Sequence, residues 1–193
     1  MKRAIVAVLT AAVLFSLSGC GGKQGSSESN QESEVSEYAE PLEALEEIMA
    51  VYDEEDLFAM YGGNQENPVM DAPGKFDISK TEELENIFGL PQDQISNIED
   101  AASMVHMMNA NTFTGAAYRL KDGVDPDDFA EAVKTSVLAK QWLCGQPDTL
   151  LIADVDGSCV ITAFGEAAIM ENFKYHLLSV HEDAEVITEA PIA

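Results

Sequence analysis

Hydrophobic positions divide the chain into three stretches. Residues 4–17 are almost continuously apolar, residues 21–37 are almost entirely polar, and the remainder mixes the two kinds of position periodically. An apolar run of this length is too short for a ~30 Å hydrocarbon layer, which needs about twenty helical residues, whereas a polar stretch like 21–37 buries too little surface to fold. We therefore expect a signal segment at 1–19, a disordered linker at 20–38 and a single domain at 39–193.

The beginning of the domain predicts two or three helices. The first contains apolar residues at helical spacing: Leu42, Leu45, Ile48, Met49 and Tyr52. This helix, or a second short one, continues to Met60, and Gly62 and Gly63 end it. Residues 64–76 carry turn formers and predict a loop. Ser79 followed by Glu82 is a capping-box pattern, which predicts another short helix.

The second half of the domain repeats the order strand, strand, helix. The predicted elements are strands at 102–108 and 114–120, a helix capped by Asp125 and ending at 142–144, strands at 149–155 and 158–164, and a helix at 166–180. The tail from about residue 183 either adds an edge strand or frays. These elements predict an α+β fold in which an antiparallel sheet of about four strands, in ββα-ββα order, carries helices mainly on one face.

Asp156-Gly157 predicts a two-residue turn between the last two strands. With that turn, strand alternation places Leu150, Ile152 and Ile161 on one face of the sheet. The opposite face then receives Leu151, Val160 and Phe164. Because both faces are apolar, we expect the N-terminal helices to cover the second one.

The first twenty residues carry an export address. Lys2 and Arg3 precede the apolar run, which ends in Leu17-Ser18-Gly19-Cys20. This ending resembles the lipobox of bacterial lipoproteins. The resemblance implies removal of residues 1–19 and attachment of fatty acyl chains, such as palmitate, to Cys20, and two acyl chains hold a protein stably on a membrane. We expect a lipid-anchored protein on the extracytoplasmic side of the cell membrane; the alternative is an ordinary secretory signal with a chance cysteine.

The net negative charge of the chain limits the classes of partner that it can bind. The full chain carries −25 at neutral pH, and losing Lys2 and Arg3 with the signal makes this −27. Such a charge argues against nucleic-acid binding, which needs Lys and Arg at phosphates. It also argues against contact with an anionic membrane other than through lipid on Cys20. Solubility explains the acidity; attraction of a cationic or envelope partner is the alternative.

Two cysteines remain after Cys20, at Cys144 and Cys159. A disulfide is permitted outside the cytoplasm, and a pair of buried free thiols is the other possibility. Without a C-x-x-C pattern, a thioredoxin-like redox function has no support.

Few residues suggest chemistry. Met104, His106 and Met108 alternate onto one face of a predicted strand, and thioether and imidazole groups suit a soft ion such as Cu(I). Core packing also explains these methionines. The chain has no G-x-S-x-G, S-x-x-K or glycine-rich phosphate loop, so we assign no catalytic, cofactor or metal residues. An envelope-acting hydrolase and a metal-handling lipoprotein remain alternatives to a binding domain.

A polar connection between the first two long strands is the candidate binding surface. Asn109, Asn111 and Thr112 offer amide and hydroxyl groups beside Phe113, and Trp142 ends the following helix. Turn chemistry alone would also select Asn and Thr there. Arg119, the only arginine after the signal, either clamps an anionic ligand or pairs with a neighbouring acid.

The layout of the chain resembles a group of small bacterial lipoproteins known only as a domain of unknown function. The shared features are the lipobox, an acidic and serine-rich linker, Phe88-Gly89-Leu90, a Met-rich strand, Lys121-Asp122-Gly123 and a closing hairpin. The resemblance implies a similar fold and brings no activity with it. We therefore expect a tethered binding or accessory domain without catalysis.

Overall fold

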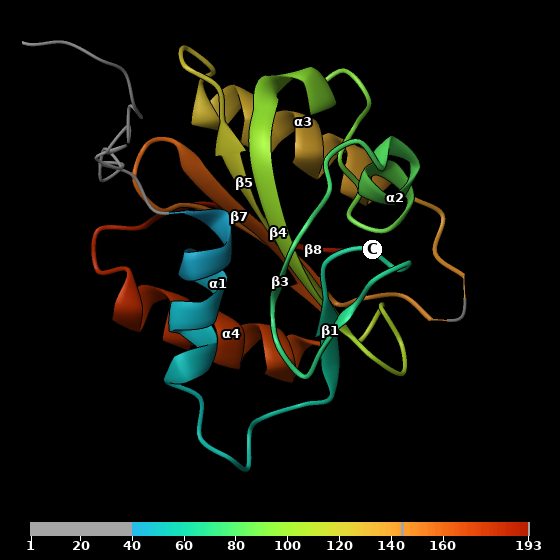
Figure 1. Cartoon of the computed structure of the whole chain (residues 1–193), viewed down its shortest axis with the longest axis vertical. Coiled ribbons are helices and arrows are strands. Elements are labelled where there is room, and N and C mark those ends of the chain that lie inside the picture. Colours follow the sequence, from blue (N-terminus) through green and yellow to red (C-terminus); the bar gives the residue numbers. More distant parts are fainter. Residues whose placement is uncertain (1–39, 144, 193) are drawn as a thin grey trace, which may run out of the picture. The chain divides into compact units, whose positions relative to one another are not determined.

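An antiparallel β-sheet forms the centre of the protein in a computed structural model (Figure 1). The structure describes residues 40–143 and 145–192, which belong to one unit spanning Val35–Ala193. The helices are α1 (Pro41–Ala50), α2 (Thr81–Asn86), α3 (Pro126–Ala139) and α4 (Ala167–Val180), with a 3-10 turn η1 (Ile95–Asn97). The strands are β1 (Met60–Gly62), β2 (Val69–Met70), β3 (Gly74–Lys75), β4 (Ile98–His106), β5 (Phe113–Leu120), β6 (Thr149–Asp154), β7 (Cys159–Gly165) and β8 (Glu185–Pro191).

The strand order is β2-β1-β4-β5-β7-β6-β8, and β3 pairs with β4 beside β1. All pairings are antiparallel. The expected α+β class with an antiparallel sheet is therefore confirmed, but the sheet has eight strands where about four were expected. Residues 60–75, expected as a helix end and a loop, supply β1, β2 and β3, and the tail supplies β8 as an edge strand.

The two crossover helices lie on opposite faces of the sheet, which corrects the expectation of helices mainly on one face. The helix α3 joins β5 to β6, a parallel strand that is separated from β5 by β7. In the same way, α4 joins β7 to the parallel strand β8, with β6 between them. Both connections step in the same direction across the sheet, whereas β5 and β7 run antiparallel. Crossovers of this kind are right-handed almost without exception, and that rule requires opposite faces for α3 and α4.

Each face of the sheet has its own hydrophobic core. On one face α2 and α3 pack Leu84, Phe129 and Val133 against Tyr118 and Ile152. On the other face α1 and α4 bury a second set, which includes Leu45, Ile48, Phe113, Ile161 and Phe173. Figure 1 shows α2 and α3 on one side of the sheet and α1 and α4 on the other. Because β5 and β7 are covered on both sides, their residues are buried throughout.

Glycines in residues 60–75 make a backbone contact that the sequence alone does not reveal. A Cβ atom on Gly62 would lie 2.0 Å from the Gly74 nitrogen and 2.6 Å from the Ser103 carbonyl oxygen. The Ser103 hydroxyl accepts a hydrogen bond from the Gly63 nitrogen at 3.0 Å and donates one to the Gly63 carbonyl at 3.2 Å. Gly62 and Gly63, expected to stop a helix, instead let β1 and β3 approach closely beside β4.

The turn between β6 and β7 is one residue longer than predicted. The Val155 nitrogen bonds the Cys159 carbonyl, so the loop contains residues 156–158. The side chain of Asp156 accepts hydrogen bonds from Ser158 and from the Cys159 nitrogen. This register pairs Ile152 with Thr162 rather than with Ile161. A shift of one residue exchanges the faces of a whole strand, so Val160 and Phe164 share a face with Leu150 and Ile152.

Helix ends follow the prediction at one place and depart from it at two. The Asp125 carboxylate caps α3 by accepting hydrogen bonds from the Asp127 and Asp128 nitrogens at 2.9 and 3.3 Å. The predicted capping box is wrong, because the N-cap of α2 is Lys80 and its side chain makes no cap hydrogen bond. The helix α3 ends at Ala139, before Trp142.

Several expectations concern residues outside the part of the chain that the structure describes. They are the signal segment 1–19, lipidation at Cys20, the linker 20–38 and the state of Cys144. Among the described residues, none of the helices combines the length and the apolar character needed to cross a membrane.

Candidate functional site

A pocket with a volume of about 580 Å³ opens beside the C-terminal end of α1. Three segments form its walls: the last turns of α1, the residues leading into β1, and the turn between β2 and β3. They contribute Glu46, Met49, Ala50, Leu57, Phe58, Ala59, Met60, Asp71, Ala72 and Pro73. Eight of these ten residues are apolar, and the volume lies within the range of small-molecule sites.

Backbone hydrogen bonds fix the two loops that form this pocket. The Met107 nitrogen donates to the Ala59 carbonyl, and the Asp71 nitrogen donates to the Met60 carbonyl, each at 2.9 Å. The ring of Phe58 packs between Phe113 and His106, with ring centroids 5.2 and 5.6 Å away. The pocket wall is therefore attached to the end of β4 and to the core beneath α1.

The side chain of His106 stacks against Phe58, a residue of the pocket wall. Its Nδ1 accepts hydrogen bonds from the Met108 and Asn109 nitrogens, both at 3.3 Å. Nδ1 must be unprotonated to accept these bonds, so the proton of the neutral ring lies on Nε2. The ring thus holds both the turn after β4 and the stacked Phe58.

Two carboxylates stand at the pocket, Glu46 on α1 and Asp71 in the turn. Asp71 has φ of 58°, the only positive φ of a non-glycine residue in the described part of the chain. Aspartate tolerates this left-handed conformation better than most residues. Both residues are exposed, and neither has a hydrogen-bond or ion-pair partner for its side chain among the described residues. The pocket therefore combines apolar walls with two uncompensated negative charges.

Exposed apolar side chains concentrate near this pocket. Of nine large hydrophobic residues that are exposed in the described chain, six lie in the α1–β1 connection, in β2 or just after β4: Val51, Leu57, Val69, Met70, Met107 and Met108. Strand pairing joins these segments, since β1 pairs with both β2 and β4. Clustered exposed apolar surface is typical of binding regions in soluble domains.

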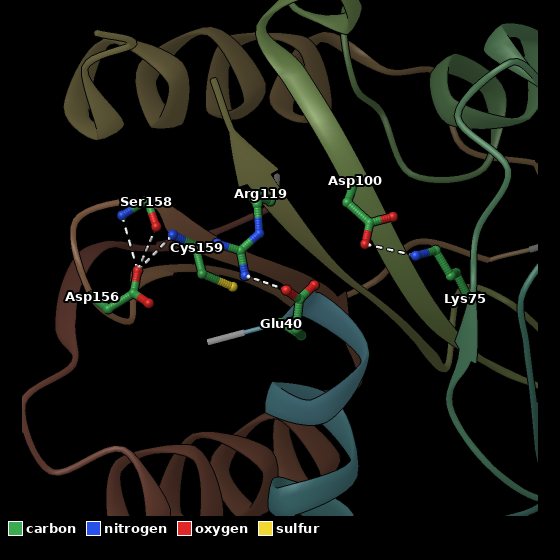
Figure 2. Close-up of polar contacts among 7 residues, drawn as sticks. All are labelled: Glu40, Lys75, Asp100, Arg119, Asp156, Ser158 and Cys159. Atoms are coloured by element: carbon green, nitrogen blue, oxygen red, sulfur yellow. Dashed lines mark hydrogen bonds and ion pairs between the residues drawn. The ribbon is translucent and has the colours of Figure 1, made fainter. Parts of the chain in front are cut away.

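A second candidate, the polar cluster around Arg119, lies where β5 ends (Figure 2). Arg119 faces Cys159 across the β5–β7 pair and is 8% exposed. Its guanidinium lies 3.4 Å from a carboxylate oxygen of Glu40, the residue that precedes α1. The predicted site residue Arg119 therefore joins the beginning of the domain to the sheet.

The thiol of Cys159 in this cluster is not a nucleophile at neutral pH. Burial, together with the charge of Asp156, raises the pKa of Cys159 to about 12, although Arg119 opposes the shift. The thiolate is the reactive form of cysteine. A catalytic thiol consequently has no support here, and the cluster of Figure 2 is a structural one.

The predicted polar surface does not form as one unit. The Asn111 amide donates to the Leu143 and Gly145 carbonyls at 2.9 and 2.7 Å, the Asn109 side chain accepts from the Asn111 nitrogen, and the Thr112 hydroxyl donates to Glu166. Trp142 packs edge-on against Phe164. These four residues surround the start of β5, whereas Arg119 is at its end, roughly 20 Å away at the rise of a strand. The polar groups of Asn109, Asn111 and Thr112 bind neighbouring connections, whereas the Trp142 indole nitrogen has no hydrogen-bond partner among the described residues.

The predicted soft-metal strand also separates in the structure. Met104 is fully buried in the core beneath α1, while Met108 is 82% exposed beyond the end of β4. His106 has one nitrogen occupied by backbone groups. No group of three or more His, Cys, Asp or Glu residues in the described chain is arranged to hold a metal ion.

Perturbed carboxylates do not mark an acid–base site. Asp154 is the one described carboxyl group whose pKa is clearly raised, chiefly by burial, although hydrogen bonds from the Gly157 and Asp156 nitrogens lower it. Its place at the β6–β7 turn explains these contacts. The pocket carboxylates lie elsewhere, in segments the sequence pattern did not single out.

Comparisons with protein-family models, curated proteins and solved structures give no match. The candidate site therefore depends on geometry alone. Sequence reasoning missed it because its walls come from residues 46–73, which looked like a helix and a loop. The available signal was the pair Leu57 and Phe58, apolar residues directly after the acidic run 53–56.

Proposed function

We propose that this protein is a lipid-anchored, extracytoplasmic lipoprotein whose domain binds a ligand without catalysis, and that the pocket beside α1 is the binding site. The lipobox-like Leu17-Ser18-Gly19-Cys20 supports the anchor. The pocket itself carries the binding part of the proposal: it has a volume of about 580 Å³ and mostly apolar walls. Pockets of this size and character are the usual place for a small ligand.

The surroundings of the pocket favour binding over catalysis. A catalytic site needs a nucleophile or an acid–base pair within reach of its substrate. Among the pocket residues only Glu46 and Asp71 have acidic side chains, and they come from separate segments of the chain. Cys159, with its pKa raised to about 12, lies in the other cluster. Apolar contact supplies most of the interaction that this pocket offers.

Filling the pocket tests the proposal. The mature-length chain with Cys20→Ser, which cannot be acylated, is titrated with N-phenyl-1-naphthylamine, a neutral apolar fluorophore. We expect saturable binding that is lost in Ala59→Trp, because the indole ring would occupy the pocket. The matched control is Ala168→Trp, since Ala168 is also exposed but lies in the first turn of α4, outside the pocket.

The result depends on both variants remaining folded, which circular dichroism and the urea midpoint establish. Loss of binding in Ala59→Trp alone supports the pocket as the site. Equal binding by both variants, or no saturable binding by the parent chain, would show that the pocket is not a ligand site.

A further inference from the structure

Every lysine and arginine of the described chain has its ion-pair or hydrogen-bond partner outside the pocket lining. Five form ion pairs with acids: Lys75 with Asp100, Lys80 with Glu66, Arg119 with Glu40, Lys134 with Glu131 and Lys174 with Glu189. The other two, Lys121 and Lys140, donate to the carbonyls of Ser96 and Asn86. No lysine or arginine belongs to the ten residues that line the pocket. The ten lining residues therefore contribute two negative charges, from Glu46 and Asp71, and no positive charge.

Three features add to that negative potential. Glu46 and Asp71 line the pocket from two separate segments, α1 and the turn between β2 and β3. The C-terminal end of α1, which supplies Met49 and Ala50, has no basic residue in its last turn. A helix C-terminus carries a partial negative charge, which hydrogen bonds from the Val51 and Tyr52 nitrogens to the Ile48 and Met49 carbonyls reduce here. The acidic run 53–56 follows directly, and all four residues are exposed.

Apolar walls and an uncompensated negative mouth select for a particular ligand chemistry. An apolar group gains from leaving water for the pocket, and a positive group at its end meets the carboxylates. A carboxylate or phosphate at the same position would be repelled. The net charge of the mature chain, −27 once the signal is removed, enriches cations around the whole domain.

We infer that the pocket beside α1 binds an organic cation with an apolar body, of the alkylammonium class, with its apolar part against Met49, Phe58 and Met60 and its positive group near Glu46 and Asp71. The inference rests on the proposed function, because it assigns the ligand class of the same pocket. A purely apolar site would not distinguish ligands by charge, whereas this pocket should bind a cation most tightly, a neutral ligand less tightly and an anion least.

Three probes with one chain length test this order. Octyltrimethylammonium, octanol and octanoate are titrated separately into the mature-length Cys20→Ser chain at low ionic strength. The readout is the NMR signal of methionine ε-methyl groups, because Met49 and Met60 line the pocket. Met170, a buried residue of α4 that does not line this pocket, is the internal control. We expect shifts at Met49 and Met60, with the cation binding about five- to tenfold more tightly than octanol and octanoate binding least.

Charge variants identify the residues responsible. In the double variant Glu46→Gln with Asp71→Asn, we expect the cation to bind about five- to tenfold more weakly and octanol to bind unchanged. Asparagine also tolerates the left-handed conformation of position 71, so the turn is preserved. The matched control is Glu43→Gln with Asp93→Asn, which removes two exposed acids outside the pocket. Raising the salt to about 0.5 M should shrink the preference for the cation, because surface charges are screened.

The outcomes separate the two proposals. Equal affinity for octanol and the cation, or the same loss in both double variants, would overturn the cation inference and leave the apolar pocket intact. An absence of shifts at Met49 and Met60 with all three probes would overturn the proposed function as well. Selective loss of cation binding in the pocket variant supports both.

Discussion

Gly62 and Gly74 touch backbone to backbone, so that a Cβ atom on Gly62 would lie 2.0 Å from the Gly74 nitrogen. The clash of a Cβ atom at Gly62 could not be relieved by a change of side-chain rotamer, because the atoms it would meet belong to the backbone. Met60 and Pro73 lie within two residues of these glycines, and both line the pocket. The close approach of β1 and β3, and with it this side of the pocket, therefore depends on Gly62 and Gly74.

Gly62→Ala should destabilise the protein by about 3 kcal/mol or more, as expected when extra volume is forced into a packed site. Urea unfolding measures the change. The control is Gly123→Ala, where a Cβ meets nothing within 4 Å but φ is 84°; its cost should be about 1 kcal/mol from the left-handed backbone alone. Equal costs in the two variants would contradict the close contact.

Arg119→Met should destabilise the domain by about 1–3 kcal/mol, because it removes a buried charge that the surroundings are built to bind. Glu40→Gln should cost less, about 0.2–1 kcal/mol, since the Glu40 side chain is 52% exposed. A double-mutant cycle from urea unfolding isolates their coupling. Additive effects of the two substitutions would show that the ion pair at 3.4 Å contributes no stability.

Cys159 should make the protein less stable at alkaline pH. Burial raises the pKa of its thiol from 9.0 to about 12. A raised folded-state pKa contributes stability that is complete below the unfolded value and is lost as pH rises through the folded value. Between about pH 9 and 12 the free energy of unfolding of the parent chain should therefore decline more steeply than that of Cys159→Ala. The two slopes against pH, measured by urea unfolding, should differ by an amount that corresponds to at most one proton.

The same burial should protect the Cys159 thiol from iodoacetamide. We expect alkylation only after unfolding in urea, measured by mass spectrometry of the peptide. A disulfide with Cys144 would leave this peptide unmodified in urea unless reductant is added, and would appear as a cross-linked pair.

Asn111→Ala should loosen the connection after α3. The amide of Asn111 bonds the carbonyls of Leu143 and Gly145, and losing both bonds at an exposed site should cost about 1 kcal/mol. The chain has a single tryptophan, Trp142, so its emission reports on this connection directly. We expect a red shift in Asn111→Ala and none in Asn67→Ala, which alters an exposed asparagine without a side-chain bond.

Cys20→Ser tests the anchor. We expect the parent protein in the membrane fraction with a diacylated N-terminal cysteine, detected by mass spectrometry of the mature chain. The variant should lack the lipid and the processing at residue 20. Recovery of the parent protein as an unmodified secreted chain would instead support the ordinary secretory signal.

Local patterns were sufficient to predict the second half of the fold. The apolar segments that form β4 to β7 and the Asp125 cap are determined by neighbouring residues, and the structure contains both. The β6–β7 turn was predicted one residue too short, because the side chain of Asp156 closes a three-residue loop that resembles a two-residue turn in sequence. That single residue exchanged the predicted faces of β7.

Non-local contacts explain what the sequence did not reveal. Gly62 and Ser103 are far apart along the chain, so the strand β1 looked like a helix end until its partner was known. The pocket depends on the same tertiary contact. Asp71 gave no local sign of its positive φ. Predicted site residues such as Asn111 were recognised as polar loop residues, but their partners in the 143–145 connection could not be inferred.

The pairing of β5 with β7 has a consequence for how the domain folds. The hairpins β4–β5 and β6–β7 each form from neighbouring segments, whereas β5 and β7 pair across the whole of α3 and β6. We expect the docking of the two hairpins to be the slow step of folding, because it closes that long loop. The strands β5 and β7, which we expect to pair last, lie in the middle of the sheet. Their amides should exchange with solvent only when the whole domain opens.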